Sequence, residues 1–371
     1  MKIDFISRNN NRRLLLLMAG WSTDADFYTA VDCPGWDVVV VSDYSDLSAR
    51  ELGEIQERYE TVYLIAWSLG VAVAEYLAST GELNSERVTA AYSVNGTPCP
   101  VSDAYGIPDN IYDGTERNLT HATLRRFLNR MSSSSDKYRY TSPKPVTQYD
   151  IESLRLQLRN LRNLHFGHPL LPWMRAYISE NDLIFRPDNQ RRYWSEKSIQ
   201  TVDIPSGHYI PLDVIARMVT PDISRIGQRF EQAVDYDAHA EAQHAIAHHL
   251  LSLLPADTDN PDHILELGTG TGYFTRLIAS AIHPAEMTMV DLYMTPRFGI
   301  APAENHIAMD AELFMGEVAD THKYDMIVSA STIQWFADIR LFFKRAASAL
   351  THKGMLLCSS FLPGNYMNWS R

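Results

Sequence analysis

The chain has 371 residues, a length that suggests two or three domains. It is 45% hydrophobic and 21% charged, which is typical of a globular protein with sizeable buried cores. The formal net charge of -12 argues against general nucleic-acid binding. The three cysteines lie far apart and offer neither a disulfide framework nor paired metal-ligand spacing, so we expect a reducing compartment and no metal site.

The start of the chain resembles a signal peptide, because Arg12 and Arg13 precede the apolar run from Leu14 to Met18. That run is too short for a signal peptide, and it is also too short to span a membrane. We interpret it as a buried strand. We therefore expect a cytoplasmic protein with no membrane partner.

Strands and helices alternate along the first 218 residues. This alternation predicts an α/β domain with a mostly parallel sheet that is covered on both faces. The expected strands cover residues 2–6, 14–18, 37–41, 63–65, 87–94, 173–178 and 198–204, and the expected helices cover residues 52–58, 71–80 and 212–218.

Ser68 stands at the junction between a strand pattern and a helix pattern. The run from Val62 to Ile65 predicts a buried strand, and helix formers follow from Val71. Ala66 and Gly70 are small enough for a tight turn. This pattern indicates a nucleophile elbow, which presents a serine hydroxyl at the edge of a sheet. A buried serine in an ordinary strand–helix turn is the alternative.

Hydrolases with such an elbow use two backbone N–H groups to stabilise the oxyanion of the transition state. The residue after the nucleophile, Leu69, is one expected donor. Trp21, in the loop after an early strand, is the other. One such donor can contribute about 3–4 kcal/mol to transition-state stabilisation. A simple turn with a packed aromatic ring is the alternative for Trp21.

A serine nucleophile needs a base, and the base needs an orienting carboxylate. Asp182 and His208 each follow an expected strand, and His208 precedes an expected helix. The order Ser68, Asp182, His208 is the chain order of α/β-hydrolases. Asp103, in the loop after another strand, is the alternative acid.

The strand pattern stops between residues 114 and 165, where helical stretches at 119–131 and 151–164 predict a lid over the site. This segment has ten basic and four acidic residues, a net charge of +6. Its arginines predict a docking surface for an acidic partner, with a solvated charged face as the alternative. The expected docking residues are Arg125, Arg126, Arg155 and Arg159.

Three blocks of the first half resemble one family. They are Ala66–Gly70, Asn95–Pro98 with Asp103 and Gly106–Pro108, and Gly207–Pro211. Together they resemble the BioG group of pimeloyl-[acyl-carrier protein] methyl ester esterases, over about residues 1–218. The resemblance implies a cofactor-free serine hydrolase that demethylates pimeloyl on acyl carrier protein for biotin synthesis. Acyl carrier protein is acidic, so the resemblance also suggests a partner for the basic lid.

The second half shows a similar alternation after a junction near residues 220–226. A helical pattern from Phe230 to Leu254 comes first. We expect a second, Rossmann-like domain over residues 225–371. Its expected strands cover residues 263–267, 287–290, 305–309, 324–330 and 354–361.

The first of these strands runs into a glycine-rich loop, Gly268–Gly272. Glycines let a backbone approach a ligand closely, and the start of a helix favours negative groups. Tyr273 stands where a dinucleotide-binding fingerprint has its last glycine, which disfavours NAD. Asp291 follows the next strand and is placed to accept hydrogen bonds from ribose hydroxyls.

Four strand ends resemble the motifs of class I S-adenosylmethionine-dependent methyltransferases. They are Glu266 with its glycines, Asp291, Asp310–Ala311 and Tyr324–Ile327. The resemblance implies S-adenosylmethionine as the cofactor. The expected contacts are Glu266, Gly268, Gly270, Asp291, Asp310 and Ala311, and loop capping is the alternative for the two aspartates.

Further residues resemble the BioC group of malonyl-[acyl-carrier protein] O-methyltransferases, which methylate the free carboxyl of malonyl on acyl carrier protein. They are Phe230, Ala233, Tyr236, His239, Ala240 and Gln243, together with Ser331–Phe336. The resemblance suggests that Tyr236 helps to hold the substrate, with a packed aromatic as the alternative.

Members of the BioC group continue well beyond the position of Asn365. We therefore expect a C-terminally truncated methyltransferase domain with an incomplete sheet. The combined interpretation is a bifunctional protein for biotin-precursor synthesis. Two alternatives remain: a general acyl ester or thioester hydrolase joined to an unrelated methyltransferase, or a second half that only binds the cofactor or docks the carrier.

Overall fold

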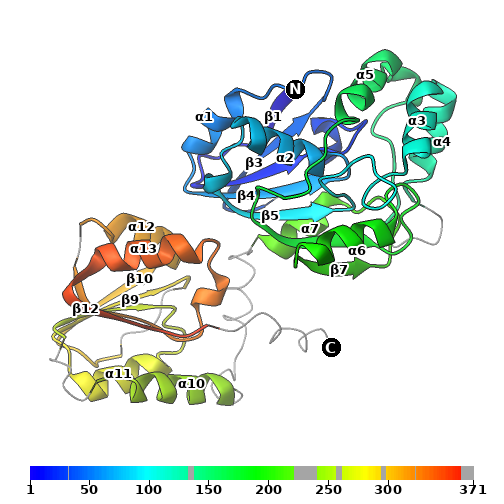
Figure 1. The fold of residues 1–371 in the computed structure, drawn as a ribbon. Coiled ribbons are helices and arrows are strands. Elements are labelled where there is room, and N and C mark those ends of the chain that lie inside the picture. The colour runs from blue at the N-terminus through cyan, green and yellow to red at the C-terminus, as the bar shows by residue number, and fades with distance from the viewer. Residues whose placement is uncertain are drawn as a thin grey trace. The chain divides into compact units, whose positions relative to one another are not determined.

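The computed structural model divides the chain into two compact units, Met1–Thr220 and Pro221–Arg371 (Figure 1). Each unit is described by itself. The described residues are 1–31, 33–132, 138–220, 240–255, 261–293, 298–321 and 323–360, with the backbone alone at 217–219.

The first unit is built on a seven-stranded sheet with the order β1-β3-β2-β4-β5-β6-β7. Only β1 is antiparallel to its neighbour. The central strands β2, β3 and β4 are buried along their whole length, which explains their continuous apolar runs. The strands are β1 (Lys2–Ser7), β2 (Arg13–Met18), β3 (Trp36–Ser42), β4 (Thr61–Trp67), β5 (Val88–Val94), β6 (Trp173–Ser179) and β7 (Gln200–Ile204).

Four helices accompany this sheet: α1 (Glu51–Glu57), α2 (Gly70–Thr80), α6 (Pro187–Glu196) and α7 (Leu212–Val219). Three of them match the sequence prediction. The sequence did not predict α6, because most of its residues are polar. It begins with Pro187 in its first turn, where the missing N–H costs nothing. The unit has the α/β-hydrolase fold.

A helical insertion separates β5 from β6 and forms one end of the first unit (Figure 1). It contains α3 (Asp109–Arg117), α4 (His121–Asn129) and α5 (Ile151–Leu161). Thr120 caps α4 in a capping box, and Asp150 caps α5. The insertion begins earlier than residue 114, which lies inside α3. This difference adds two acidic residues, Asp109 and Asp113, to the lid.

The second unit has a five-stranded, fully parallel sheet with the order β10-β9-β8-β11-β12. Helices α10 and α11 cover one face, and α12 and α13 cover the other (Figure 1). Among the described residues, β12 has a strand neighbour on one side only. The elements are α10 (Glu241–Ser252), β8 (His263–Leu267), α11 (Tyr273–Ile282), β9 (Glu286–Asp291), β10 (Ala303–Ala308), α12 (Ala311–Val318), β11 (Tyr324–Ser329), α13 (Ile339–Ala349) and β12 (Leu350–Cys358).

The two-sided, Rossmann-like sheet confirms the α/β prediction for this unit. Phe230 to His239, with Tyr236, lie outside the described residues, as do residues 361–371. In the described part of the chain, no helix is both long and apolar enough to cross a lipid bilayer.

Candidate active site and cofactor site

Ser68 lies in the sharp turn between β4 and α2, with a φ of 57°. This left-handed conformation is strained for a residue with a side chain, and such strain persists only where neighbours hold the backbone. The Ser68 N–H donates to the Val94 carbonyl at 2.8 Å. A Cβ at Gly70 would lie 2.6 Å from the carbonyl oxygens of Met18 and Ala19, so the turn requires glycine there.

The structure brings Ser68, His208 and Asp182 together in one hydrogen-bonded chain. His208 Nε2 lies 2.9 Å from Ser68 Oγ, and His208 Nδ1 lies 2.8 Å from Asp182 Oδ2. The other Asp182 oxygen accepts the backbone N–H groups of Ile184 and Phe185, each at 2.8 Å. All three side chains are buried. This geometry lets His208 take the serine proton while the carboxylate orients the ring.

Asp103, the alternative acid, is occupied elsewhere. Its side chain accepts the backbone N–H of Asp109 at 3.2 Å, and its carbonyl accepts from the Asn189 amide. It therefore fixes the entry to α3. The carboxylate that meets His208 is that of Asp182.

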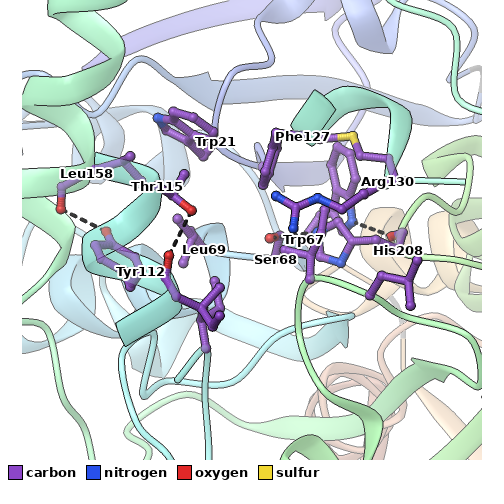
Figure 2. Close-up of a pocket in the computed structure, with 16 residues that line it drawn as sticks. Trp21, Trp67, Ser68, Leu69, Tyr112, Thr115, Phe127, Arg130, Leu158 and His208 are labelled. Carbon is purple, nitrogen blue, oxygen red and sulfur yellow. Dashed lines mark hydrogen bonds between the residues drawn. The ribbon is translucent and has the colours of Figure 1, made fainter. Parts of the chain in front are cut away.

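Trp21 and Leu69 line the cavity around Ser68 (Figure 2). Among the hydrogen bonds of the described residues, none uses the backbone N–H of Trp21 or Leu69. Gly20 allows its loop to pass close to the elbow, since a Cβ at Gly20 would meet the Trp67 ring at 2.7 Å. Two N–H groups without partners beside a serine are what an oxyanion hole requires.

Asn95 holds His208 through the backbone of the histidine. Its Nδ2 donates to the His208 carbonyl at 2.7 Å and to Ser179 Oγ at 2.8 Å, and its Oδ1 accepts the Ser179 N–H at 2.7 Å. The Trp67 indole also donates to the His208 carbonyl, at 3.2 Å. The sequence reasoning did not assign Asn95 this role. Its position directly after a strand, beside Gly96, was the available signal.

The cavity that contains Ser68 and His208 is mainly apolar (Figure 2). Ile111 and Leu183 are among its lining residues and remain 46% and 67% exposed, so apolar side chains also face solvent there. Arg130 is the cationic side chain of the lining. The other lining residues are Gly20, Trp21, Trp67, Leu69, Ile107, Tyr112, Thr115, Phe127, Met131, Leu158 and Ile184.

Arg155 is unsuited to the docking role that the sequence predicted. Its guanidinium donates to the backbone carbonyls of Glu116 at 3.3 Å and Leu119 at 2.7 Å, and it also pairs with Glu152. Its side chain is only 19% exposed. Arg155 therefore joins α5 to the end of α3 and the start of the next turn.

The neighbouring arginines of α5 face the acidic side of α3. Arg159 pairs with Glu116 at 2.9 Å, and Arg162 pairs with Asp109 at 2.9 Å and with Asp113. The sequence reasoning started the lid at residue 114 and so left out two of these acids. In contrast, Arg125 and Arg126 on α4 are exposed and form no ion pair with a described residue.

The glycine-rich loop of the second unit follows β8 and precedes α11. Gly268, Gly270 and Gly272 have φ values of 78°, 53° and 79°, in the left-handed region that favours glycine. A Cβ at Gly268 would collide with the Thr332 side chain. The loop thus needs glycine for its conformation and, at Gly268, for packing.

The two predicted strand-end aspartates lie at the same edge of this sheet. Asp291 Oδ2 accepts the Gly270 N–H at 2.7 Å and so braces the glycine loop. Asp310 caps α12 by accepting the N–H groups of Glu312 and Leu313 at 2.7 and 3.2 Å. Ala311 is the first residue of α12. These two bonds of Asp310 are the capping contacts of the alternative interpretation.

Glu266 is a buried carboxyl whose charge is not balanced by the described residues. It is 1% exposed, and its Oε2 has no hydrogen-bond partner among the described residues. The nearby loop residue Thr269 is also buried, and its hydroxyl has no partner in the same part of the chain. Burial, together with the negative charge of Asp291, raises the pKa of Glu266 to about 8. Such orphaned polar atoms beside a glycine loop fit a polar ligand, and the donor set suits S-adenosylmethionine.

The first unit matches a known protein family. The family model of the pimeloyl-ACP methyl esterase BioG matches residues 1–215. The chain belongs to the BioG family. The crystal structure of BioG from Haemophilus influenzae is 30% identical in sequence, with a TM-score of 0.48 over 57% of this chain and 95% of that chain.

The BioG domain is followed by a methyltransferase domain, whose family model matches residues 236–368. A malonyl-[acyl-carrier protein] O-methyltransferase of Bacteroides fragilis (strain 638R) is 29% identical over 364 residues, which cover 94% of this chain and 72% of the relative. Another protein of that name, from Priestia megaterium (strain DSM 319 / IMG 1521), is 34% identical over 139 residues. Those residues span 50% of that relative and 36% of this chain. The chain therefore joins an ester hydrolase to a methyltransferase.

Proposed function

We propose that the first unit, about residues 1–218, hydrolyses the methyl ester of pimeloyl carried on acyl carrier protein, with Ser68 as the nucleophile. The observation that carries this proposal is the continuous hydrogen-bonded chain from Ser68 through His208 to Asp182. The BioG family match supplies the substrate class.

The reaction proceeds in two steps. Ser68 Oγ attacks the ester carbonyl carbon while His208 Nε2 takes its proton, and the backbone N–H groups of Trp21 and Leu69 hold the oxyanion. The tetrahedral intermediate then expels methanol, which receives the proton from His208. Water, deprotonated by His208, attacks the acyl-enzyme and releases the free carboxyl group and the serine.

The apolar cavity supports an esterified substrate. A neutral methyl ester can enter the apolar surroundings of Ser68 at little cost, whereas an ionised carboxylate pays for its desolvation. Ile111 and Leu183 offer contact for the methylene chain. Hydrolysis thus converts a group that the cavity accepts into one that water prefers, which favours product release.

The test is methanol release from pimeloyl-[acyl-carrier protein] methyl ester by the whole chain. We expect Ser68→Ala to abolish release. Ser79→Ala, at the exposed end of α2, is the matched control and should keep the full rate. Undiminished release by Ser68→Ala would overturn the proposal.

We further propose that the second unit, about residues 225–371, binds S-adenosylmethionine and methylates the carboxyl group of a malonyl thioester on acyl carrier protein. S-Adenosylmethionine would supply the electrophilic methyl group. Gly268 and Gly270 would let the backbone approach it, Asp291 would accept from its ribose, and Asp310 with Ala311 would border its base. Glu266 would face its positively charged end.

Calorimetric titration of the chain with S-adenosylmethionine tests this second activity. Gly268→Val would clash with Thr332 and displace the loop, so we expect it to abolish binding. Gly299→Val is a suitable control, because nothing lies within 4 Å of its added Cβ although its φ is also positive. Binding without methyl transfer to malonyl-[acyl-carrier protein] would reduce this unit to a binding module.

Acyl carrier protein would dock on α4 rather than on α5. Arg125 and Arg126 are exposed there, and Arg130 reaches the catalytic cavity from the same helix. Arg159 and Arg162 are instead paired with acidic residues of α3. An acidic carrier would be steered to the exposed charges of α4 and would deliver its acyl chain beside Arg130. Both substrates are carrier-bound, which fits a cytoplasmic biosynthetic protein.

Charge reversal separates carrier docking from general esterase activity. Arg125→Glu with Arg126→Glu should raise KM for the carrier-bound ester roughly 10-fold and leave hydrolysis of a small carrier-free ester unchanged. Arg58→Glu, at an exposed position after α1, is the control and should alter neither. If carrier-bound and carrier-free esters were hydrolysed at equal rates by both the original chain and the charge-reversed variant, a general ester hydrolase would be favoured.

A further inference from the structure

The Trp21 side chain connects the oxyanion loop to the lid. Its indole N–H donates to the backbone carbonyl of Leu154 in α5 at 3.0 Å, within a buried environment. Its ring also packs edge to face on Phe127 of α4, with the centroids 4.9 Å apart (Figure 2). One residue, 3% exposed, therefore contacts two lid helices that are more than a hundred positions away in the sequence.

The other side of the same loop is held by β3 and by the turns that follow the loop and β3. The Ala19 N–H donates to the Val41 carbonyl of β3 at 2.9 Å. Tyr44 Oη donates to the Ala19 carbonyl at 2.6 Å, and the Gly20 N–H donates to Tyr28 Oη at 3.1 Å. Thr23 Oγ1 donates to the Gly20 carbonyl at 2.7 Å. Residues 19, 20 and 23 are thus held by these bonds, whereas residue 21 contacts the lid through its side chain.

We propose that the Trp21 indole is a positioning group that places its own backbone N–H in the oxyanion hole only while the lid is seated. The proposal rests on the assignment of Trp21 as an oxyanion donor. The bonds of residues 19, 20 and 23 fix where the loop begins and ends. The contacts of the Trp21 side chain with the lid set the orientation of the peptide between them. Movement of α4 or α5 away from the indole would release that peptide and weaken the hole.

This arrangement links substrate delivery to chemistry. Phe127 lies on α4, the helix that carries Arg125, Arg126 and Arg130. Any partner that holds α4 against the body of the hydrolase also holds the Phe127–Trp21 contact. Transition-state stabilisation by a backbone donor depends on its placement, and a shift of about 1 Å can cost about 100-fold in rate.

The test is Trp21→Phe, which keeps an aromatic ring beside Phe127 and removes the indole N–H. We expect kcat for the carrier-bound methyl ester to fall about 10-fold with KM changed less than about 2-fold, because the lost interaction acts on the transition state. The inhibition constant of hexylboronic acid, which forms an anionic tetrahedral adduct with the serine, should rise by about the same factor.

Trp36→Phe is the matched control. Trp36 is also buried, and its indole N–H has no hydrogen-bond partner among the described residues. Both kcat and the inhibition constant of hexylboronic acid should therefore stay at their original values in Trp36→Phe. An equal loss in Trp36→Phe would assign the effect to aromatic repacking. An increase of KM alone in Trp21→Phe would assign Trp21 to substrate contact. Either result overturns the proposal.

Phe127→Leu provides a second route if Trp21→Phe folds poorly. It should also weaken the binding of hexylboronic acid. The double variant should lose less binding free energy than the sum of the two single losses, because both substitutions act on one contact. Full additivity would contradict the proposal. If Ser68→Ala abolishes hydrolysis but all of these variants retain kcat, the esterase assignment stands and only the role of the indole fails.

Discussion

The two units differ in how completely the protein itself satisfies its functional polar groups. In the hydrolase unit, Ser68, His208 and Asp182 are bonded to one another, and the remaining Asp182 oxygen accepts two backbone N–H groups. In the methyltransferase unit, Glu266 Oε2 and the Thr269 hydroxyl are equally buried yet lack partners among the described residues.

This difference separates two ways of building a site. A hydrolytic triad must be arranged before the substrate arrives, since its groups act on charge that appears only in the transition state. A cofactor site can leave polar groups unsatisfied, because the cofactor supplies their partners and its binding energy offsets the cost. The first unit is therefore organised by its own contacts, and we propose that the second is completed by its cofactor.

Among the substitutions that test this comparison, Asp182→Asn in the hydrolase unit should have the largest effect. The amide can donate to His208 Nδ1, which leaves the ring proton on Nε2, so the ring cannot take the Ser68 proton and kcat should fall about 10⁴-fold. Steady-state methanol release measures this loss. Asp103→Asn should leave kcat unchanged, and a comparable loss there would return Asp103 to consideration as the acid.

Glu266 predicts a pH dependence that belongs to the methyltransferase unit. Its pKa rises from 4.5 to about 8 on folding because of burial, so the native unit binds more protons than the unfolded chain. Its contribution to stability is fully present below about pH 4.5 and is lost as the pH rises through about 8. Calorimetric unfolding without cofactor should show a decline of a few kcal/mol across this range.

Glu266→Gln serves as the control, because it keeps the size of the side chain and removes its titration. For the second unit, the difference in unfolding free energy between the original chain and this variant should change with pH. For the first unit, the two chains should unfold alike at every pH. If this difference did not change with pH, the Glu266 carboxyl would have a partner in the folded unit. The protein itself would then satisfy the polar groups of this site, as it does in the triad.

Asn95→Ala would sharpen the account of how the hydrolase site is held. The substitution removes three buried hydrogen bonds to Ser179 and His208, and we expect a loss of roughly 3 kcal/mol of unfolding free energy together with slower hydrolysis. Denaturant unfolding and methanol release measure the two effects. A stable variant with a full rate would show that Trp67 alone holds the His208 backbone.

Arginines of the lid should give the smallest effects. Arg155→Gln removes the bonds to the Glu116 and Leu119 carbonyls, so unfolding free energy should fall by about 1–2 kcal/mol. Arg125→Gln, at an exposed site on α4, should change it by less than about 0.5 kcal/mol. Equal stabilities would contradict the division between structural arginines on α5 and exposed arginines on α4.

The sequence predicted the parts of the hydrolase that follow from strand order. Alternating strands and helices bring the carboxyl ends of parallel strands to one edge, so Ser68, Asp182 and His208 could be identified by their positions after strands. The same reasoning located Gly268 and Asp291 in the second unit. Local pattern and chain order are sufficient when each functional residue follows its own strand.

Side-chain pairing between distant elements could not be predicted in this way. Arg155, Arg159 and Arg162 share a helical face, but the acidic partners of Arg162 became apparent only when α3 was found to begin at Asp109. The role of Asn95 depends on three strand ends meeting in space. The polar composition of α6 concealed a helix whose burial depends on aromatic contacts with other elements, such as that of Trp194 with Trp173 of β6.

The most direct test of the central claim is covalent labelling of the whole chain with a fluorophosphonate, followed by peptide mapping and an assay of methanol release. The account predicts one adduct on Ser68, loss of methanol release in proportion to labelling, and no adduct in His208→Gln, where the serine lacks its base. Full labelling of Ser68 with methanol release retained would contradict it.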